Sequence, residues 1–229
     1  MQKTKLKVTE ICKDIILVQS PSYKKLRQTW MRFEEAYENP VLNIKKLGKK
    51  FTKDDVLKWW KTTGEGKKHP YYFTGFNIPS YILGYFYDGM FDPLDQLEKN
   101  LLKTLKPFYE TRKKFYIIGT FKTPKPDVIQ HEIAHGFYYN SVKYRTDAKK
   151  IMAKLSRKVK TKIDNYLHKE TGYGGHVLVD ERHASILSDT LKELTSMGIK
   201  LSEIKVERTA MNKLYAKTYR EMRKEKDKR

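Results

Sequence analysis

Cysteine is almost absent from this chain. The only one among 229 residues is Cys12, which has no second cysteine with which to form an intramolecular disulfide. The same scarcity excludes zinc ribbons built from cysteine pairs, so histidines and carboxylates would have to hold any metal. Such low cysteine usage is typical of a protein from a reducing compartment.

Long hydrophobic runs are missing as well. Apolar stretches such as 15–18 and 116–118 are far shorter than the roughly 20 residues that a membrane-spanning helix needs. The N-terminal segment MQKTKLKVTEICKDIILVQS lacks the apolar core and the small-residue cleavage site of a signal peptide. We therefore expect a cytoplasmic protein without a transmembrane segment.

Acidic residues are few in comparison with basic ones. There are 27 Asp and Glu against 48 Lys and Arg, which gives a net charge of +21. This excess could serve binding to nucleic acid, to an anionic membrane surface or to an acidic partner, or it could be a solvated lysine-rich surface. No zinc-finger spacing or RNA-binding aromatic motif accompanies it. Nucleic acid and an acidic partner therefore stay open as predicted partners.

The chain does contain enough apolar material for a folded core, with 39% hydrophobic and 13% aromatic residues. Its apolar periodicity predicts a β-rich start over 6–19 and a strand over 114–121. It predicts helices over 23–37, 52–62, 95–109, 127–140, 142–168 and 184–197, with Asp127 as an N-cap and Gly198 after the last helix. The fold class expected from this order is α+β, with a small mixed sheet and mainly helical surroundings.

The sequence HEIAH at 131–135 carries the strongest chemical signal. On a helix, His131 and His135 lie one turn apart on one face, where both can bind a single tetrahedral ion. Glu132 is rotated by about 100° from His131, so its carboxylate can reach a water on the metal instead of the metal itself. The alternative is a surface helix with two ordinary histidines, but its apolar flanks predict a buried helix, whose imidazoles need partners.

A catalytic zinc site needs a third protein ligand. Position 141 is Ser, which excludes the compact HExxHxxxxxH arrangement, so the third ligand must come from further along the chain. The candidates are His168, His176, Glu181 and His183. The ExxA spacing favours Glu181, because Ala184 allows close approach to the motif helix; His176 and His183 stay as alternatives. Asp180 and Glu181 could instead be helix-initial acids that complement the helix dipole.

With this motif and the acidic segment at 177–189, the chain resembles the HExxH zinc metallopeptidases called zincins, and within them the gluzincin type. The ExxA form is similar to the small repressor-cleaving metallopeptidases of mobile elements. The resemblance implies that His131, His135 and Glu181 bind Zn²⁺ and that Glu132 is the catalytic base. It also implies that the strand 116–121 is a sheet edge on which substrate adds as a further strand. The acid that gluzincins carry four residues after the glutamate ligand is Ser185 here, so Asp180 or Asp189 would orient a motif histidine instead.

The resulting prediction is a zinc-dependent metallopeptidase that acts on a protein or peptide substrate, with Tyr173, His176 and His183 as candidate donors to the oxyanion. The expected organisation is an N-terminal α/β portion at 1–94, a zincin-like catalytic core at 95–200 and a basic helical tail at 201–229. The alternative is a non-catalytic or DNA-tethered basic protein that binds nucleic acid on a zincin scaffold. An intact Glu132 argues against a non-catalytic scaffold, since such a protein has no chemical need for that acid.

Overall fold

The computed structural model describes residues 6–39, 41–42, 44–62, 75–122, 124–170, 175 and 177–229. It confirms an α+β protein with a small mixed sheet and a majority of helices. The chain divides into two compact units, residues 1–124 and 125–229. This division differs from the predicted boundaries at 94 and 200, because the segment 96–121 belongs with the N-terminal sheet and the C-terminal helix belongs with the unit that carries HEIAH.

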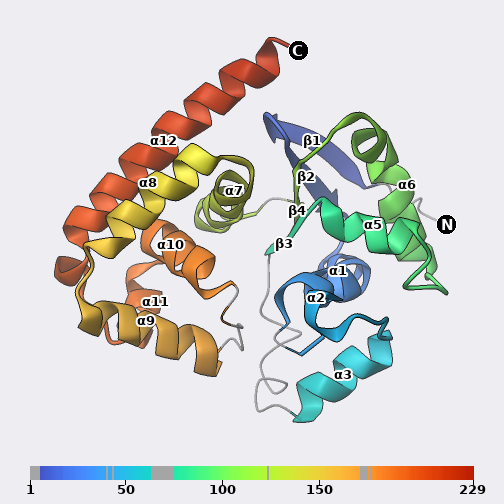
Figure 1. The fold of residues 1–229 in the computed structure, drawn as a ribbon, viewed down its shortest axis with the longest axis horizontal. Coiled ribbons are helices and arrows are strands. Elements are labelled where there is room, and N and C mark those ends of the chain that lie inside the picture. Colours follow the sequence, from blue (N-terminus) through green and yellow to red (C-terminus); the bar gives the residue numbers. More distant parts are fainter. Residues whose placement is uncertain are drawn as a thin grey trace. The chain divides into compact units, whose positions relative to one another are not determined.

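The first unit contains a four-stranded sheet in the order β1-β2-β4-β3 (Figure 1). Strand β1 (Lys7–Cys12) runs antiparallel to β2 (Ile15–Ser20), β2 is parallel to β4 (Tyr116–Phe121), and β4 is antiparallel to β3 (Gly75–Pro79). Strand β4 therefore has a neighbour on each side, and the expectation that it is an open edge for substrate is wrong. Its residues Tyr116, Ile117 and Ile118 are all fully buried, as is typical of a central strand covered on both faces.

Helix α1 (Tyr23–Glu38) packs on this sheet and forms the centre of the first unit's core. Ser22 caps its N-terminus by accepting a hydrogen bond from the backbone N–H of Lys25. The side chains of Leu26, Trp30 and Phe33 recur at helical spacing and are fully buried. The other described helices of this unit are α2 (Ile44–Leu47), α3 (Lys53–Thr62), α5 (Tyr81–Tyr87) and α6 (Gln96–Thr111).

A buried ion pair joins α1 to α6. Arg32 donates from Nε and Nη2 to the two carboxylate oxygens of Glu98, at 2.7 and 2.6 Å, and from Nη1 to the carbonyl of Phe91 at 2.8 Å. The side chains are 6% and 0% exposed, so both charges have been removed from water. The fork-shaped guanidinium satisfies both carboxylate oxygens, which is the geometry that such burial requires.

In the described part of residues 125–229, all the regular structure is helical. It comprises α7 (Pro126–Asn140), α8 (Val142–Ala153), α9 (Arg157–Glu170), α10 (Leu178–Ser188), α11 (Leu191–Ser196), the short 3₁₀ helix η2 (Leu201–Glu203) and α12 (Lys205–Asp227). Helix α10 packs against α7, α9 and α12, and α12 also lies along α8 (Figure 1). No helix in the described ranges is long and apolar enough to cross a membrane.

Three details of the predicted helices are corrected in this unit. The helix expected over 142–168 is two helices, because the chain turns between Ala153 and Arg157 and Ser156 caps the second. The helix expected over 184–197 is also interrupted, since Thr190 and Glu193 form a capping box that starts α11. Lys125, and not Asp127, occupies the N-cap of α7. Gly198 does follow α11 with a positive φ of 68°, as predicted.

Candidate metal centre

Helix α7 holds the HEIAH segment in its middle. Pro126 in the first turn suits the helix start, because its fixed φ is helical and its missing N–H would have no partner there. Asp127 in the same turn is acidic, which complements the positive end of the helix dipole. Glu132 and His135 are buried, and His131 is partly exposed. The prediction that the motif lies on a largely buried helix is therefore confirmed.

Helix α10 brings a carboxylate to the two motif histidines. Ala184 is fully buried at the third position after Glu181, and small residues at helix contacts permit close packing, as between α10 and α7. Nε2 of His131 lies 3.6 Å from Oε2 of Glu181, and Nε2 of His135 lies 3.5 Å from Oε1 of the same residue. One ligand atom from each of these residues lies within 4.8 Å of the other two. We call this set, His131, His135 and Glu181, the metal triad.

Each motif histidine has a fixed partner on its Nδ1 atom. The hydroxyl of Ser188 donates to the carbonyl of Ala184 at 2.8 Å, so it can only accept from Nδ1–H of His131, which lies 3.0 Å away. Oδ1 of Asp180 lies 3.0 Å from Nδ1 of His135 and accepts a hydrogen bond from its N–H. When a ring is neutral, these partners favour the tautomer whose Nε2 lone pair faces Glu181, which is the form that binds a metal.

A hydrogen-bond chain extends from Asp180 into the core. Nδ1 of His183 lies 2.8 Å from the carbonyl of Asp180 and 3.1 Å from its Oδ1, so this nitrogen donates. The other nitrogen, Nε2, must then accept from the hydroxyl of Tyr144 at 3.2 Å. The ring of Tyr138 stacks on His183 with centroids 4.9 Å apart. Because both of its nitrogens are engaged and it is fully buried, His183 has the geometry of a residue that positions Asp180, not of an oxyanion donor.

The electrostatics of the cluster favour positive charge at the triad. Burial by itself would lower the pKa of His135, but the carboxylates of Asp180 and Glu181 outweigh it and raise that pKa to about 10. Burial would raise the pKa of Asp180, yet His135 and His183 lower it to about 2. The pKa of His131 is also raised, because Glu181 overcomes the desolvation penalty. A field that holds a proton this firmly also attracts a metal cation.

The remaining sequence candidates differ in where the structure places them. Tyr173 and His176 lie outside the described residues. His168 lies on α9 and is exposed, and it does not belong to the metal triad. Of the two acids considered for orienting a motif histidine, Asp180 makes the hydrogen bond to His135. The other acid, Asp189, is buried, and this burial raises its pKa to about 6.

Two residues that form hydrogen bonds around the candidate site were missed by sequence reasoning. Ser188 lies seven residues after Glu181, so it shares a helix face with that residue, and this spacing could have identified it. Tyr144 lies on α8, the helix that follows the motif helix, and it is buried. Its sequence context is the same as that of any tyrosine in a hydrophobic core. No periodicity distinguishes a core tyrosine that donates to a histidine from one that only packs.

The triad fits a divalent metal by its donor set. Nε2 of His135 is buried and makes no hydrogen bond within the described part of the chain, although Glu181 lies nearby. Leaving a buried imidazole nitrogen unsatisfied is costly unless another partner binds it. Two imidazole nitrogens and one carboxylate form one of the ligand sets of catalytic zinc, which leaves a further coordination position for water.

Comparisons with known proteins gave no match: none of the protein-family models, none of the curated proteins and none of the solved structures resembles this chain significantly.

Proposed function

We propose that this protein is a zinc-dependent metallopeptidase with a gluzincin-like ligand set. The observation that carries the proposal is the convergence of His131, His135 and Glu181, whose ligand atoms lie within 4.8 Å of one another although 46 positions separate His135 from Glu181 in the sequence (181 − 135 = 46). Zinc is favoured over harder cations because two of the three ligand atoms are imidazole nitrogens. In the HExxH motif, Glu132 directly follows the first ligand, His131, and supplies a carboxylate beside the metal triad.

The chemistry assigned to each residue follows from its position. Bound zinc would polarise the scissile carbonyl and lower the pKa of a water at the site. His131, His135 and Glu181 would hold the ion, and Ser188 and Asp180 fix the orientation of the two rings. Glu132 accepts the proton of the attacking water on its carboxylate and delivers it to the leaving amine. The buried position of Glu132 limits competition from bulk water for that proton.

The first test is the zinc content of protein purified without added metal. We expect about one zinc ion per chain in the wild type and in Glu132→Gln, because Glu132 is not a ligand. His135→Ala should retain little zinc, since it loses one of three ligands. Elemental analysis together with an equilibrium competition against a chromophoric chelator would measure both stoichiometry and affinity.

Asp147→Ala provides a control for the loss of an acid in the same unit, because Asp147 lies on α8 with a side chain that is 34% exposed and is not in the metal triad. It should bind zinc like the wild type. Zinc binding by His135→Ala with wild-type affinity would contradict the metal triad, and so would the absence of zinc binding by wild-type protein when zinc is supplied.

A second test concerns the partners of the two histidines. Replacing Asp180 by Asn removes the charged acceptor of His135, so we expect zinc affinity to fall by about 10- to 100-fold. Ser188→Ala removes a neutral acceptor from His131 and should cost less. The chelator competition gives both values, and neither substitution should change the stoichiometry at saturating zinc. An affinity unaffected by Asp180→Asn would contradict its role in orienting His135.

A further inference from the structure

A chain of four largely buried side chains leads from the metal triad into the core of the second unit. It begins at His135, whose Nδ1 lies 3.0 Å from Oδ1 of Asp180, and continues to Nδ1 of His183, 3.1 Å from the same oxygen. It ends at the hydroxyl of Tyr144, 3.2 Å from Nε2 of His183. The helices α7, α10 and α8 all contribute to it. We call these four residues the Tyr144 chain.

Asp180 is the point at which the Tyr144 chain meets the metal triad. A single oxygen, Oδ1, lies within hydrogen-bonding distance of ring nitrogens of both His135 and His183. The side chain of Asp180 is only 12% exposed, so its carboxylate depends on donors from the protein. Rotation of this carboxylate away from His135 would therefore break two hydrogen bonds instead of one.

The ring of His183 is fixed in its orientation. Its Nδ1 faces two acceptors, the carbonyl oxygen of Asp180 at 2.8 Å and Oδ1 of the same residue, so Nδ1 carries a hydrogen. The ring of Tyr138 stacks on it with centroids 4.9 Å apart, and the ring of Tyr144 meets it nearly at a right angle at 5.5 Å. A flipped ring would lose these hydrogen bonds within the same tight packing.

Tyr144 satisfies the remaining nitrogen of His183. When this ring is neutral, Nε2 is an acceptor, and the tyrosine hydroxyl donates to it. Tyr144 is 1% exposed, and its ring packs on Phe137 with centroids 5.4 Å apart. Apolar side chains of the same size would fill this space without polar atoms to desolvate, so packing alone does not account for the pair. Support of the carboxylate of Asp180 does account for it.

We propose that Tyr144 and His183 are positioning residues for the metal triad. Tyr144 holds His183 with Nδ1–H toward Asp180, and His183 holds Oδ1 of Asp180 against Nδ1 of His135. His135 then presents Nε2 to the metal. The metal affinity of the triad thus depends on a residue of α8 that is not itself a ligand. This inference rests on the metal centre of the proposed function, but not on the peptidase reaction.

The test is a double-mutant cycle on the full-length protein, with zinc dissociation constants measured by chelator competition. Tyr144→Phe removes only the hydroxyl and should weaken zinc binding by about 3- to 10-fold, the equivalent of one hydrogen bond. In an Asp180→Asn background the same change should cost less than about twofold, because Tyr144 acts through this carboxylate. No loss in Tyr144→Phe, or a loss of the same size in both backgrounds, would overturn the proposal.

His183 can be tested with a disruptive and a conservative variant. His183→Leu removes the donor to Asp180 and should weaken zinc binding by about tenfold or more. His183→Asn keeps a side-chain N–H near the position of Nδ1 and should recover part of this loss. Thermal melting shows whether each variant folds, and if the leucine variant does not, the cycle with Tyr144→Phe decides. An asparagine variant that folds but binds zinc no better than the leucine variant would overturn the role of Nδ1.

Tyr219→Phe is the matched control for the loss of a tyrosine hydroxyl. Tyr219 lies on α12 in the same unit, and its ring contacts the Phe137 ring that also packs on Tyr144. Zinc affinity should change by less than about twofold. A loss equal to that of Tyr144→Phe would overturn the proposal, since any hydroxyl in this core would then have the same effect.

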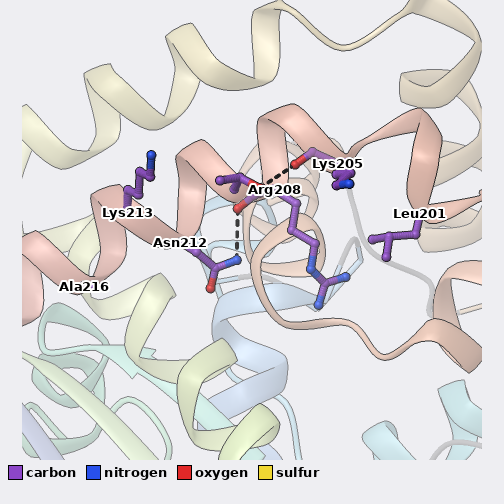
Figure 2. A pocket seen from close by; sticks show the side chains of 7 residues that line it. Leu201, Lys205, Arg208, Asn212, Lys213 and Ala216 are labelled. Atoms are coloured by element: carbon purple, nitrogen blue, oxygen red, sulfur yellow. Dashed lines mark hydrogen bonds between the residues drawn. The ribbon is translucent and has the colours of Figure 1, made fainter.

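Asn212→Ala is a control for the loss of a hydrogen bond to the motif helix. Nδ2 of Asn212 donates to the carbonyl of Arg208 at 2.9 Å, in the lining of the pocket that Figure 2 shows. Its Oδ1 accepts from Nε2 of Gln130 on α7 at 3.3 Å, so this contact orients no imidazole. Zinc affinity should again stay within about twofold of the wild type. A loss like that of Tyr144→Phe would indicate that any contact to α7 matters, and would overturn the proposal.

NMR of the histidine side chains gives a readout that does not depend on zinc affinity. Proton–nitrogen correlation spectra should show His183 as the Nδ1–H tautomer. The signal of Nδ1–H of His135 in the zinc-bound protein should shift in Tyr144→Phe and stay unchanged in Tyr219→Phe. The opposite tautomer of His183 would overturn the proposal. Absence of zinc binding by the wild type would contradict the metal triad itself, whereas unchanged affinity in Tyr144→Phe beside a zinc-binding wild type would contradict only the positioning role.

Discussion

Glu132→Gln should lower kcat/KM for hydrolysis of an unstructured protein substrate by about 10²- to 10⁴-fold, the usual contribution of a general base. The amide is nearly the same size as the carboxylate but cannot accept a proton from the attacking water. Because Glu132 is not in the metal triad, zinc content should be unchanged. A loss of activity without a loss of metal would separate the base from the ligands.

Glu221→Gln gives the same chemical change on α12, where the side chain is 56% exposed. It should hydrolyse substrate at the wild-type rate. Wild-type activity in Glu132→Gln would contradict the assignment of this residue as the base. A parallel loss of zinc and activity in Glu132→Gln would show instead that Glu132 maintains the metal site.

Arg32→Met should destabilise the first unit by about 3–5 kcal/mol, the usual cost of removing one partner of a buried ion pair. Methionine keeps most of the apolar stem, but Glu98 is left in the core without its two guanidinium hydrogen bonds. Lys53 at 3.8 Å from Glu98 can offset only part of this loss. The double variant Arg32→Met, Glu98→Met should recover much of the stability, since it removes both charges.

Tryptophan fluorescence during urea unfolding would measure this change in one unit alone. All three tryptophans, Trp30, Trp59 and Trp60, lie in residues 1–124. Lys24→Met removes an exposed cation from the same helix and should leave the unfolding midpoint nearly unchanged. An unchanged midpoint in Arg32→Met would contradict a stabilising role for the pair.

Much of the fold was predictable because local signals agree with tertiary packing. The helices at 23–37 and 95–109 have caps at Ser22 and Asp95 and a clear apolar stripe, and the structure has them as α1 and α6. The position of β4 was not predictable in this way. Strand order depends on pairing with β2 and β3, which lie far away in the sequence, and period-2 patterns do not specify neighbours. The two interrupted helices show that apolar spacing continues across a short turn when both segments pack on one core.

The metal ligands of the candidate site were predictable, because His and Glu at the HExxH spacing are recognisable in the sequence. The HEIAH spacing predicts two ring nitrogens on one face, and the structure brings Glu181 to them. The roles of Ser188, Tyr144 and His183 depend on hydrogen bonds between helices, and their residue types are equally common in ordinary cores. His183 illustrates the limit, because its position near Glu181 suggested a donor to substrate whereas its two nitrogens serve Asp180 and Tyr144.

The unequal exposure of the two motif histidines has a consequence for metal exchange. The side chain of His131 is 24% exposed, whereas that of His135 is 2% exposed and is held by a carboxylate. Solvent therefore reaches the triad from the His131 side, and an external chelator would displace that ligand first. His135 and Glu181 would release a metal last, so dissociation of His131 would be the first step of metal loss. The rate of metal loss should accordingly depend more on His131 and Ser188, and the final affinity more on His135 and Asp180.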